Sequence, residues 1–290
     1  MGIPVFHVRV RYPLVQLMPI VHQRARAAIR AALFHFLGSL LAAAMAAALV
    51  LWVWFPHPYD LLSGGRQLFL IVVGVDVVCG PLLTLVLFNP QKSRRELIAD
   101  MSLVVLMQLA ALAYGLHTTH EARPLFLVHE VDRFRVITLG DYGGADVGEA
   151  IALLDAPLRP HWLKGPATVG IRDPRDAQER QTVMLESVLG GRDYSQRPEF
   201  YVPYDAAYQA KALARAKPLR AFIARYPATA GDAAGLLNGY GVTADDVLFL
   251  PVLHRQDWVA VLDRSAGILG FLPGDGFEVR ERKLRIDASG

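Results

Sequence analysis

The chain has 290 residues, of which 53% are hydrophobic and 20% are charged, and its formal net charge at pH 7 is +3. The first 120 residues hold 9 of the 30 basic residues and 4 of the 27 acidic ones, so the remaining part is nearly neutral. Because that part has no basic stripe that could follow a phosphate backbone, the composition argues against nucleic-acid binding.

Three apolar blocks precede residue 120 and cover residues 33–55, 67–88 and 97–116. Each is about 20 residues long, which at a rise of about 1.5 Å per residue crosses a hydrocarbon core of about 30 Å. We therefore predict three transmembrane helices. The first block is too long for a signal peptide and has no small-residue cleavage site after it, so we expect it to stay in the protein. Residues 1–19 have no helical period, and Met18 is as good a start as Met1.

The short loops indicate how these helices are oriented. Basic residues cluster before the first helix and between the second and the third, whereas the loop between the first and the second has only Arg66. By the positive-inside rule, the N-terminus and the second loop are cytoplasmic. We thus expect a multi-pass membrane protein with a basic cytoplasmic segment (1–30), a three-helix membrane domain (31–120), a domain on the far side of the membrane (121–275) and a charged tail (276–290). In a Gram-negative cell the far side is the periplasm.

The part beyond residue 120 is expected to form a soluble α+β domain around an antiparallel sheet. Residues 124–139 predict two strands joined by a turn near Asp132, and residues 245–275 predict three short antiparallel strands. Between them, residues 176–191 and 205–227 have the pattern of helices. Strands at both ends with helices between them favour the α+β class.

Local signals bound these helices. Asp176 is the expected N-cap of the first, with Glu179 at capping-box spacing, while Pro218 should break the second and Pro227 should end it. The single cysteine, Cys79, lies inside the second membrane block. The exported domain therefore has no disulfide, and its stability must come from a packed core.

Known catalytic motifs are missing from the sequence, which contains no nucleophile elbow, zinc-protease helix or phosphate-binding loop. His117 and His120 share a helix face, but no third ligand is evident nearby, so we expect no metal and no cofactor. We expect a protein that is not an enzyme. A periplasm-facing enzyme stays an alternative, because Glu130 and Asp132 would share one face of a strand and could act as an acid–base pair.

The second membrane block carries a carboxylate, Asp76, near its middle. At this depth an acidic side chain costs about 2.5 to 3.5 kcal/mol on insertion scales, so it normally faces protein or water and has a partner. Gln108 of the third block lies at the same depth, since both residues are about 17 Å from the cytoplasmic ends of their helices. Pro81 has no N–H for the carbonyl of Val77, which leaves that oxygen free beside the carboxylate. Thr84 belongs to a second polar layer.

Two interpretations of these residues stay open. In the first, Asp76 is satisfied by Gln108, and the pair locks the three helices together. In the second, an intramembrane polar cluster binds a partner or handles a proton. The residues of this cluster are Asp76, Gly80, Pro81, Thr84 and Gln108.

Several motifs cover residues 34–137 densely, namely WFP.PY, SGGR.LF, GVDVV.GPLLTLV.FNP.K and ARP.....EVDRFRV. With them the chain resembles the type IV pilin accessory proteins of the TfpX/TfpZ type, and a looser likeness continues in residues 197–204 and 257–273. Positions that match the family pattern are Asp76, Gly80, Pro81, Asn89 and Pro90 in the membrane part and Arg123, Glu130, Asp132 and Arg133 beyond it.

The resemblance implies a protein of the bacterial inner (cytoplasmic) membrane that assists the assembly, stability or surface display of a cognate type IV pilin, without known catalysis. It thereby implies a part in fimbrium biogenesis and twitching motility. The implied partners are the major pilin, the lipid bilayer and other pilus assembly proteins. Our hypothesis is that the Asp76 face packs against the apolar helix of the pilin, while Arg123, Glu130, Asp132 and Arg133 contact the pilin head. A pilin-modifying enzyme and a structural scaffold of the assembly platform are the alternatives.

Overall fold

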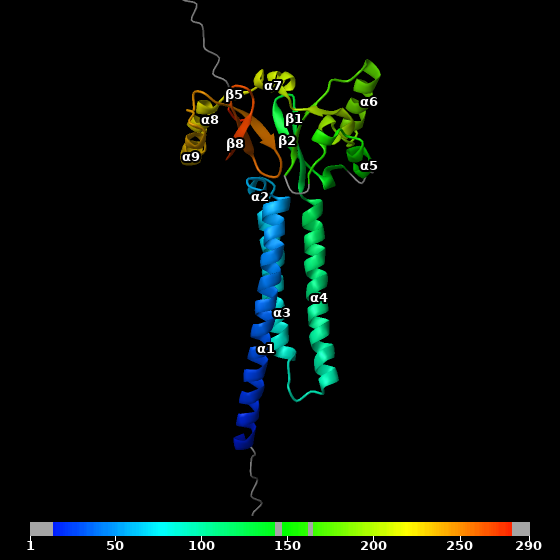
Figure 1. Ribbon diagram of the computed structural model, residues 1–290, viewed down its shortest axis with the longest axis vertical. Coiled ribbons are helices and arrows are strands. Elements are labelled where there is room, and N and C mark those ends of the chain that lie inside the picture. Colours follow the sequence, from blue (N-terminus) through cyan, green and yellow to red (C-terminus); the bar gives the residue numbers. More distant parts are fainter. Residues whose placement is uncertain (1–13, 143–146, 162–164, 280–290) are drawn as a thin grey trace, which may run out of the picture. The chain divides into compact units, whose positions relative to one another are not determined.

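The computed structural model of the protein describes residues 14–142, 147–161 and 165–279 (Figure 1). These residues divide into two compact units. The helical unit holds the described residues up to Ala46 together with Leu70–Leu116, and the α+β unit holds Ala47–Phe69 and the described residues from His117 onward. Most of the predicted charged tail and the start of the predicted cytoplasmic segment lie outside the described residues.

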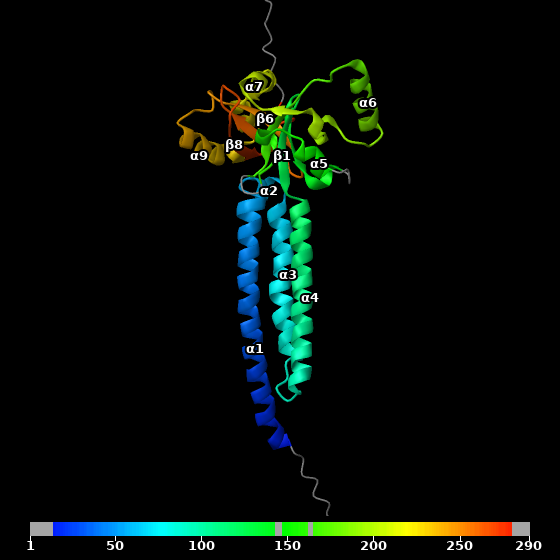
Figure 2. The same ribbon diagram turned by 45° about the vertical axis from the view of Figure 1, so that its right-hand side comes forward.

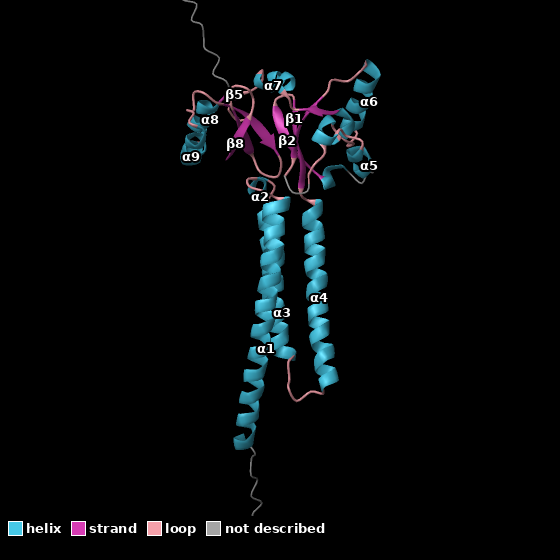
Figure 3. Ribbon diagram, viewed as in Figure 1, coloured by secondary structure: helices cyan, strands magenta, loops and turns pink. Residues whose placement is uncertain are grey.

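Three long apolar helices are present, as the hydropathy predicts (Figure 3). They are α1 (Leu14–Ala48), which continues as a π-helical turn over Leu49–Trp54, α3 (Gly65–Leu87) and α4 (Arg94–Glu121). Each is long and apolar enough to cross a membrane. α1 begins well before residue 33, because the basic stretch ahead of the apolar block is rich in Ala and Arg, which are good helix formers. It already includes residues 14–19, so the prediction that the first 19 residues lack a helical period is wrong for that part. Pro81 lies inside α3 without ending it.

One eight-stranded sheet organises the α+β unit. Its strands are β1 (Pro124–Glu130), β2 (Arg133–Thr138), β3 (Ala167–Ile171), β4 (Tyr201–Pro203), β5 (Lys217–Pro218), β6 (Leu248–Leu253), β7 (Trp258–Leu262) and β8 (Ile268–Pro273). Their order is β4-β3-β1-β2-β6-β7-β8, and β5 pairs with β6. The antiparallel neighbours β1–β2, β6–β7 and β7–β8 confirm the prediction. β1 with β3 and β2 with β6 pair in parallel, which local patterns did not indicate.

Short helices complete the α+β unit. They are α2 (Tyr59–Leu62), α5 (Val147–Ala152), α6 (Ala177–Val188), α7 (Ala206–Leu213), α8 (Leu219–Arg225) and α9 (Ala230–Tyr240). All but α2, which lies between α1 and α3, follow the first strands in the chain. α6 confirms the predicted N-cap, because the Asp176 carboxylate accepts the Glu179 N–H at 2.7 Å. Glu179 accepts the N–H of Arg175 at 2.6 Å and pairs with Arg172, instead of closing the predicted capping box on Asp176. Pro218 separates α7 from α8, as predicted.

Both faces of the sheet around β7 are buried. Trp258, Ala260 and Leu262 belong to the core on the face that α2 and α7 cover. Val259 and Val261 belong to the core on the opposite face, under α8 and α9. This alternation is the period of two that a strand imposes on its side chains. The edge strand β8 therefore lies between two covering layers, and α9 is seen beside it in Figure 2.

Candidate functional site

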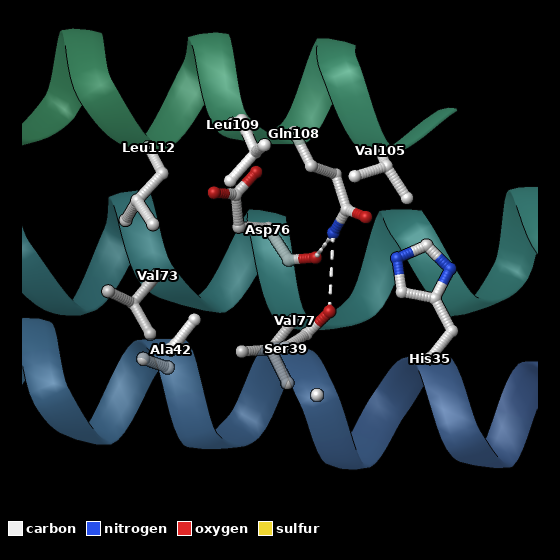
Figure 4. A pocket seen from close by; sticks show the side chains of 12 residues that line it. His35, Ser39, Ala42, Val73, Asp76, Val77, Val105, Gln108, Leu109 and Leu112 are labelled. Atoms are coloured by element: carbon white, nitrogen blue, oxygen red, sulfur yellow. Dashed lines mark hydrogen bonds between the residues drawn. The ribbon is translucent and has the colours of Figure 1, made fainter. Parts of the chain in front are cut away.

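The three long helices face one another around a cleft of about 270 Å³, which we call the intramembrane cleft (Figure 4). Its polar lining residues are His35 and Ser39 of α1, Asp76 of α3 and Gln108 of α4. The other lining residues are glycine, alanine, valine and leucine. Small side chains let helix backbones approach closely, so the cleft combines a few hydrogen-bonding groups with a surface suited to helix packing.

Gln108 is the residue that joins the helices at this cleft. Its Nε2 donates to the backbone carbonyl of Asp76 at 2.8 Å and lies 3.5 Å from the Ser39 hydroxyl (Figure 4). Gly80 makes this approach possible, because a Cβ at that position would overlap with the Gln108 amide. The predicted level pairing of α3 with α4 is therefore present, and it requires a glycine one turn beyond Asp76.

The Asp76 carboxylate takes no part in this contact. Figure 4 shows it pointing away from the amide nitrogen of Gln108. Within the part of the chain that the structure describes, it has no hydrogen bond or ion pair, and it lines the cleft partly exposed. The first interpretation pairs Gln108 with the carboxylate, but the amide bonds the backbone oxygen of Asp76 instead. That oxygen belongs to the residue before Val77, whose carbonyl Pro81 was expected to leave free.

A second polar contact joins α1 and α3. His35 Nδ1 and Thr84 Oγ1 are 2.5 Å apart, and Thr84 is buried. The sequence predicted a polar layer at Thr84 but missed His35, which lies near the start of the first apolar block. The available signal was spacing, since His35 and Ser39 are four residues apart and so share one helix face.

The four residues predicted to form a contact surface on the α+β unit are divided between two places. Glu130, Asp132 and Arg133 lie at the β1–β2 hairpin, where Asp132 and Arg133 pair with each other at 2.8 Å. Arg123 precedes β1 at the other end of that strand and lines a separate small cavity. The prediction that Glu130 and Asp132 share a strand face is wrong, because Asp132 lies in the two-residue turn and Glu130 stands opposite Arg133.

A cleft of about 690 Å³ adjoins this hairpin and is lined by residues of β1, α6 and α7. On its wall, the Tyr208 hydroxyl donates to the His129 carbonyl and accepts the Ile171 N–H. The contact of 3.2 Å between His129 Nδ1 and that hydroxyl then requires the proton on Nδ1. Burial lowers the pKa of His129 to about 4, so the ring is neutral at pH 7. Burial also raises the pKa of Glu130.

In the sequence, His117 and His120 have the spacing of two metal ligands on one helix face. Across residues 14–142, 147–161 and 165–279, no three His, Cys, Asp or Glu side chains are grouped so that they could hold a metal ion. The intramembrane cleft offers hydrogen bonding and apolar surface, whereas the cleft beside the hairpin is also lined by charged side chains, among them Glu130, Arg172 and Lys211.

The chain is similar to known proteins along most of its length. The family model described as "Fimbrial assembly protein FimB" matches residues 23–64. The "Fimbrial assembly protein, serogroup I" of Dichelobacter nodosus is 34% identical over 248 residues, which cover 84% of this chain and 94% of that relative. The chain belongs to the FimB family of fimbrial assembly proteins. Its serogroup E1 relative from the same organism is 33% identical over the same shares.

Likeness to the FimB family extends over both units. The protein of serogroups C1 and C2 of Dichelobacter nodosus is 47% identical over 107 residues, or 37% of this chain and 82% of that relative. The family match at residues 23–64 contains His35 and Ser39, so the α1 wall of the intramembrane cleft lies in the matched region. No solved structure matches this chain. The predicted resemblance to pilus accessory proteins is confirmed at the level of fimbrial assembly.

Proposed function

We propose that this FimB-family protein is an accessory protein of the bacterial inner membrane that binds a type IV pilin and holds it for fimbrial assembly. Family membership supports a role in fimbrial assembly, and the three apolar helices support a location in a membrane. The observation that carries pilin binding is the Asp76 carboxylate, which faces an open cleft without a partner among the described residues while Gln108 is engaged elsewhere. A carboxylate at this depth is costly unless a partner satisfies it.

A pilin that awaits assembly consists of an apolar helix in the membrane and a soluble head outside it. In our proposal the helix packs into the intramembrane cleft and donates a hydrogen bond to Asp76, and the head contacts the α+β unit. The N-terminus lies in the cytoplasm and the α+β unit lies in the periplasm. This role needs binding and release alone, so we propose that the protein acts without catalysis and without a cofactor.

Photo-crosslinking in cells tests this proposal. A photoreactive residue at Val73, which lines the cleft, should form adducts with pilin, while one at Val75, which is exposed on another face of α3, should not. Capture of pilin by the detergent-solubilised protein, without adducts from position 73, would place binding elsewhere. Failure of that capture would contradict the proposed function itself, and a changed pilin mass after gene deletion would favour the modifying enzyme.

A further inference from the structure

The outer edge of β8 has no partner strand among the described residues. It is the longer of the two sheet edges, since β8 has 6 residues and β4, at the other edge, has 3. Such an edge presents a row of backbone N–H and C=O groups that can pair with a further strand.

The register shows which backbone groups face outward. The Gly274 N–H donates to the Asp257 carbonyl at 2.8 Å, so this pair is hydrogen-bonded. Bonded and non-bonded pairs alternate along an antiparallel ladder, so Phe271, three residues before Gly274 and opposite Ala260, is in a non-bonded pair. The N–H and C=O of Phe271 therefore point away from β7, and Pro273 presents a carbonyl alone. A bulge near the start of β8 bounds the pairable stretch at its other end.

A cleft of about 850 Å³ runs along this edge, and we call it the β8 cleft. One wall is formed by His57, Pro58 and Leu61, at and just before α2, and the other by α9. Because α2 and α9 cover opposite faces of the sheet, the space between them lies where the next strand of the sheet would run. The α9 wall includes Gly231 and Gly235, and a Cβ on either would meet no atom within 4 Å.

We propose that an extended segment of the pilin head adds to β8 as a further strand in the β8 cleft. This inference rests on the proposed function and specifies how the head is held. Main-chain hydrogen bonds to Phe271 give the affinity, and alternate side chains of the added segment pack against Leu61 and Leu236. The pairable stretch is only a few residues long, so the contact is weak enough to release a subunit into a growing fimbria.

A second copy of this chain is a poor occupant of the same cleft. Its β8 would approach flanked by its own α2 and α9, since each covers the sheet at that edge. At the strand spacing of about 4.8 Å, these flanking elements of the two copies would compete for the same volume. A bare edge strand or an extended loop of another protein has no such obstruction.

Glycine positions on α9 supply a blocking variant and a matched control. Gly235→Leu places a side chain in the β8 cleft, whereas Gly239→Leu, one turn along the same helix, places one in open space outside it. Leucine is a better helix former than glycine, so neither substitution should lower the melting temperature. A difference between them therefore reports on the cleft and not on folding.

The test uses the full-length protein in cells that express pilin. A photoreactive residue at Asp232, which lines the β8 cleft, should give pilin adducts, and one at Asn238, on the same helix outside it, should not. Gly235→Leu should reduce the Asp232 adducts about tenfold or more, and Gly239→Leu should leave them unchanged.

Three other results overturn the inference. These are adducts that map to a second copy, adducts that map to residues 280–290 of the same chain, and pilin capture by the whole protein without any adduct at position 232. Capture of pilin in the third case leaves the proposed function standing while this inference fails. If the whole protein captures no pilin, the proposed function is contradicted, and with it this inference.

Discussion

Gln108 reaches the Asp76 carbonyl only because residue 80 is glycine. Gly80→Ala should displace the amide and push α3 from α4, so we expect the free energy of unfolding to fall by about 1 to 3 kcal/mol through overpacking and the lost hydrogen bond. Asp76→Asn changes a carboxylate that has no partner among the described residues, so it should leave stability unchanged. Thermal unfolding of the detergent-solubilised proteins compares the two variants.

The same Asp76→Asn variant separates structure from function at this residue. If the carboxylate receives a hydrogen bond from pilin, the variant should accumulate to the normal level while surface fimbriae decrease. Normal fimbriation at a normal protein level would show that the carboxylate is not needed for assembly. A loss of the protein itself would favour the interpretation in which Asp76 locks the helices.

His129 makes the α+β unit sensitive to acid. Burial lowers the pKa of its imidazole from 6.5 to about 4. Between these two pH values the ring is protonated in the unfolded chain and neutral in the folded protein. Stability contributed by the neutral ring is complete above pH 6.5 and is lost as the pH falls toward 4, by at most about 3 kcal/mol. Pulse proteolysis in urea at pH 7 and pH 5 measures this loss.

His129→Phe is the control for that pH dependence. The phenyl ring keeps the edge contacts to Phe134 and Tyr208 but has no group that titrates. The difference in stability between pH 7 and pH 5 should therefore shrink, although the hydrogen bond to Tyr208 is lost at both values. Part of the dependence should remain, because burial also lowers the pKa of His254 to about 4. An unchanged slope would exclude His129 as its source.

Among the elements, those with local signals could be predicted from the sequence. The Asp176 cap begins α6, Pro218 separates α7 from α8, and the turn near Asp132 joins β1 to β2. Hydropathy and length were enough for α1, α3 and α4. The parallel pairing of β2 with β6 was not predictable in this way, because it joins strands more than a hundred residues apart and is decided by which faces pack together.

For the intramembrane cleft, the sequence predicted which residues lie at one level but not which atoms bond. Counting residues from the helix ends brought Asp76 and Gln108 to one level. It could not choose between the carboxylate and the backbone carbonyl as acceptor, because both belong to the same residue and the choice depends on how the helices are rotated. The rotation of α3 is set by its packing against α4 at Gly80, and the sequence alone does not show which residues of the two helices meet.

At the scale of the whole molecule, the proposal depends on the orientation of the chain in the membrane. The loop between α3 and α4 carries Lys92, and Arg94 and Arg95 follow it at the start of α4, which by the positive-inside rule favours the cytoplasm. Lys92 also pairs with Asp100 at 2.5 Å, but acidic residues have little influence on this rule. In the proposed arrangement, three crossings put the α+β unit on the opposite side, where a pilin head would be.

Single-cysteine labelling tests that orientation. The single native cysteine, Cys79, is replaced by alanine, and cysteine is introduced at Gln91 in the α3–α4 loop or at Asn238 on α9, both of which are exposed. A membrane-impermeant maleimide applied to spheroplasts should label position 238 at once and position 91 only after lysis, because a charged reagent does not cross the hydrocarbon core. The reverse pattern would put the α+β unit in the cytoplasm, out of reach of the pilin head, and would refute binding at the β8 cleft together with the proposed arrangement.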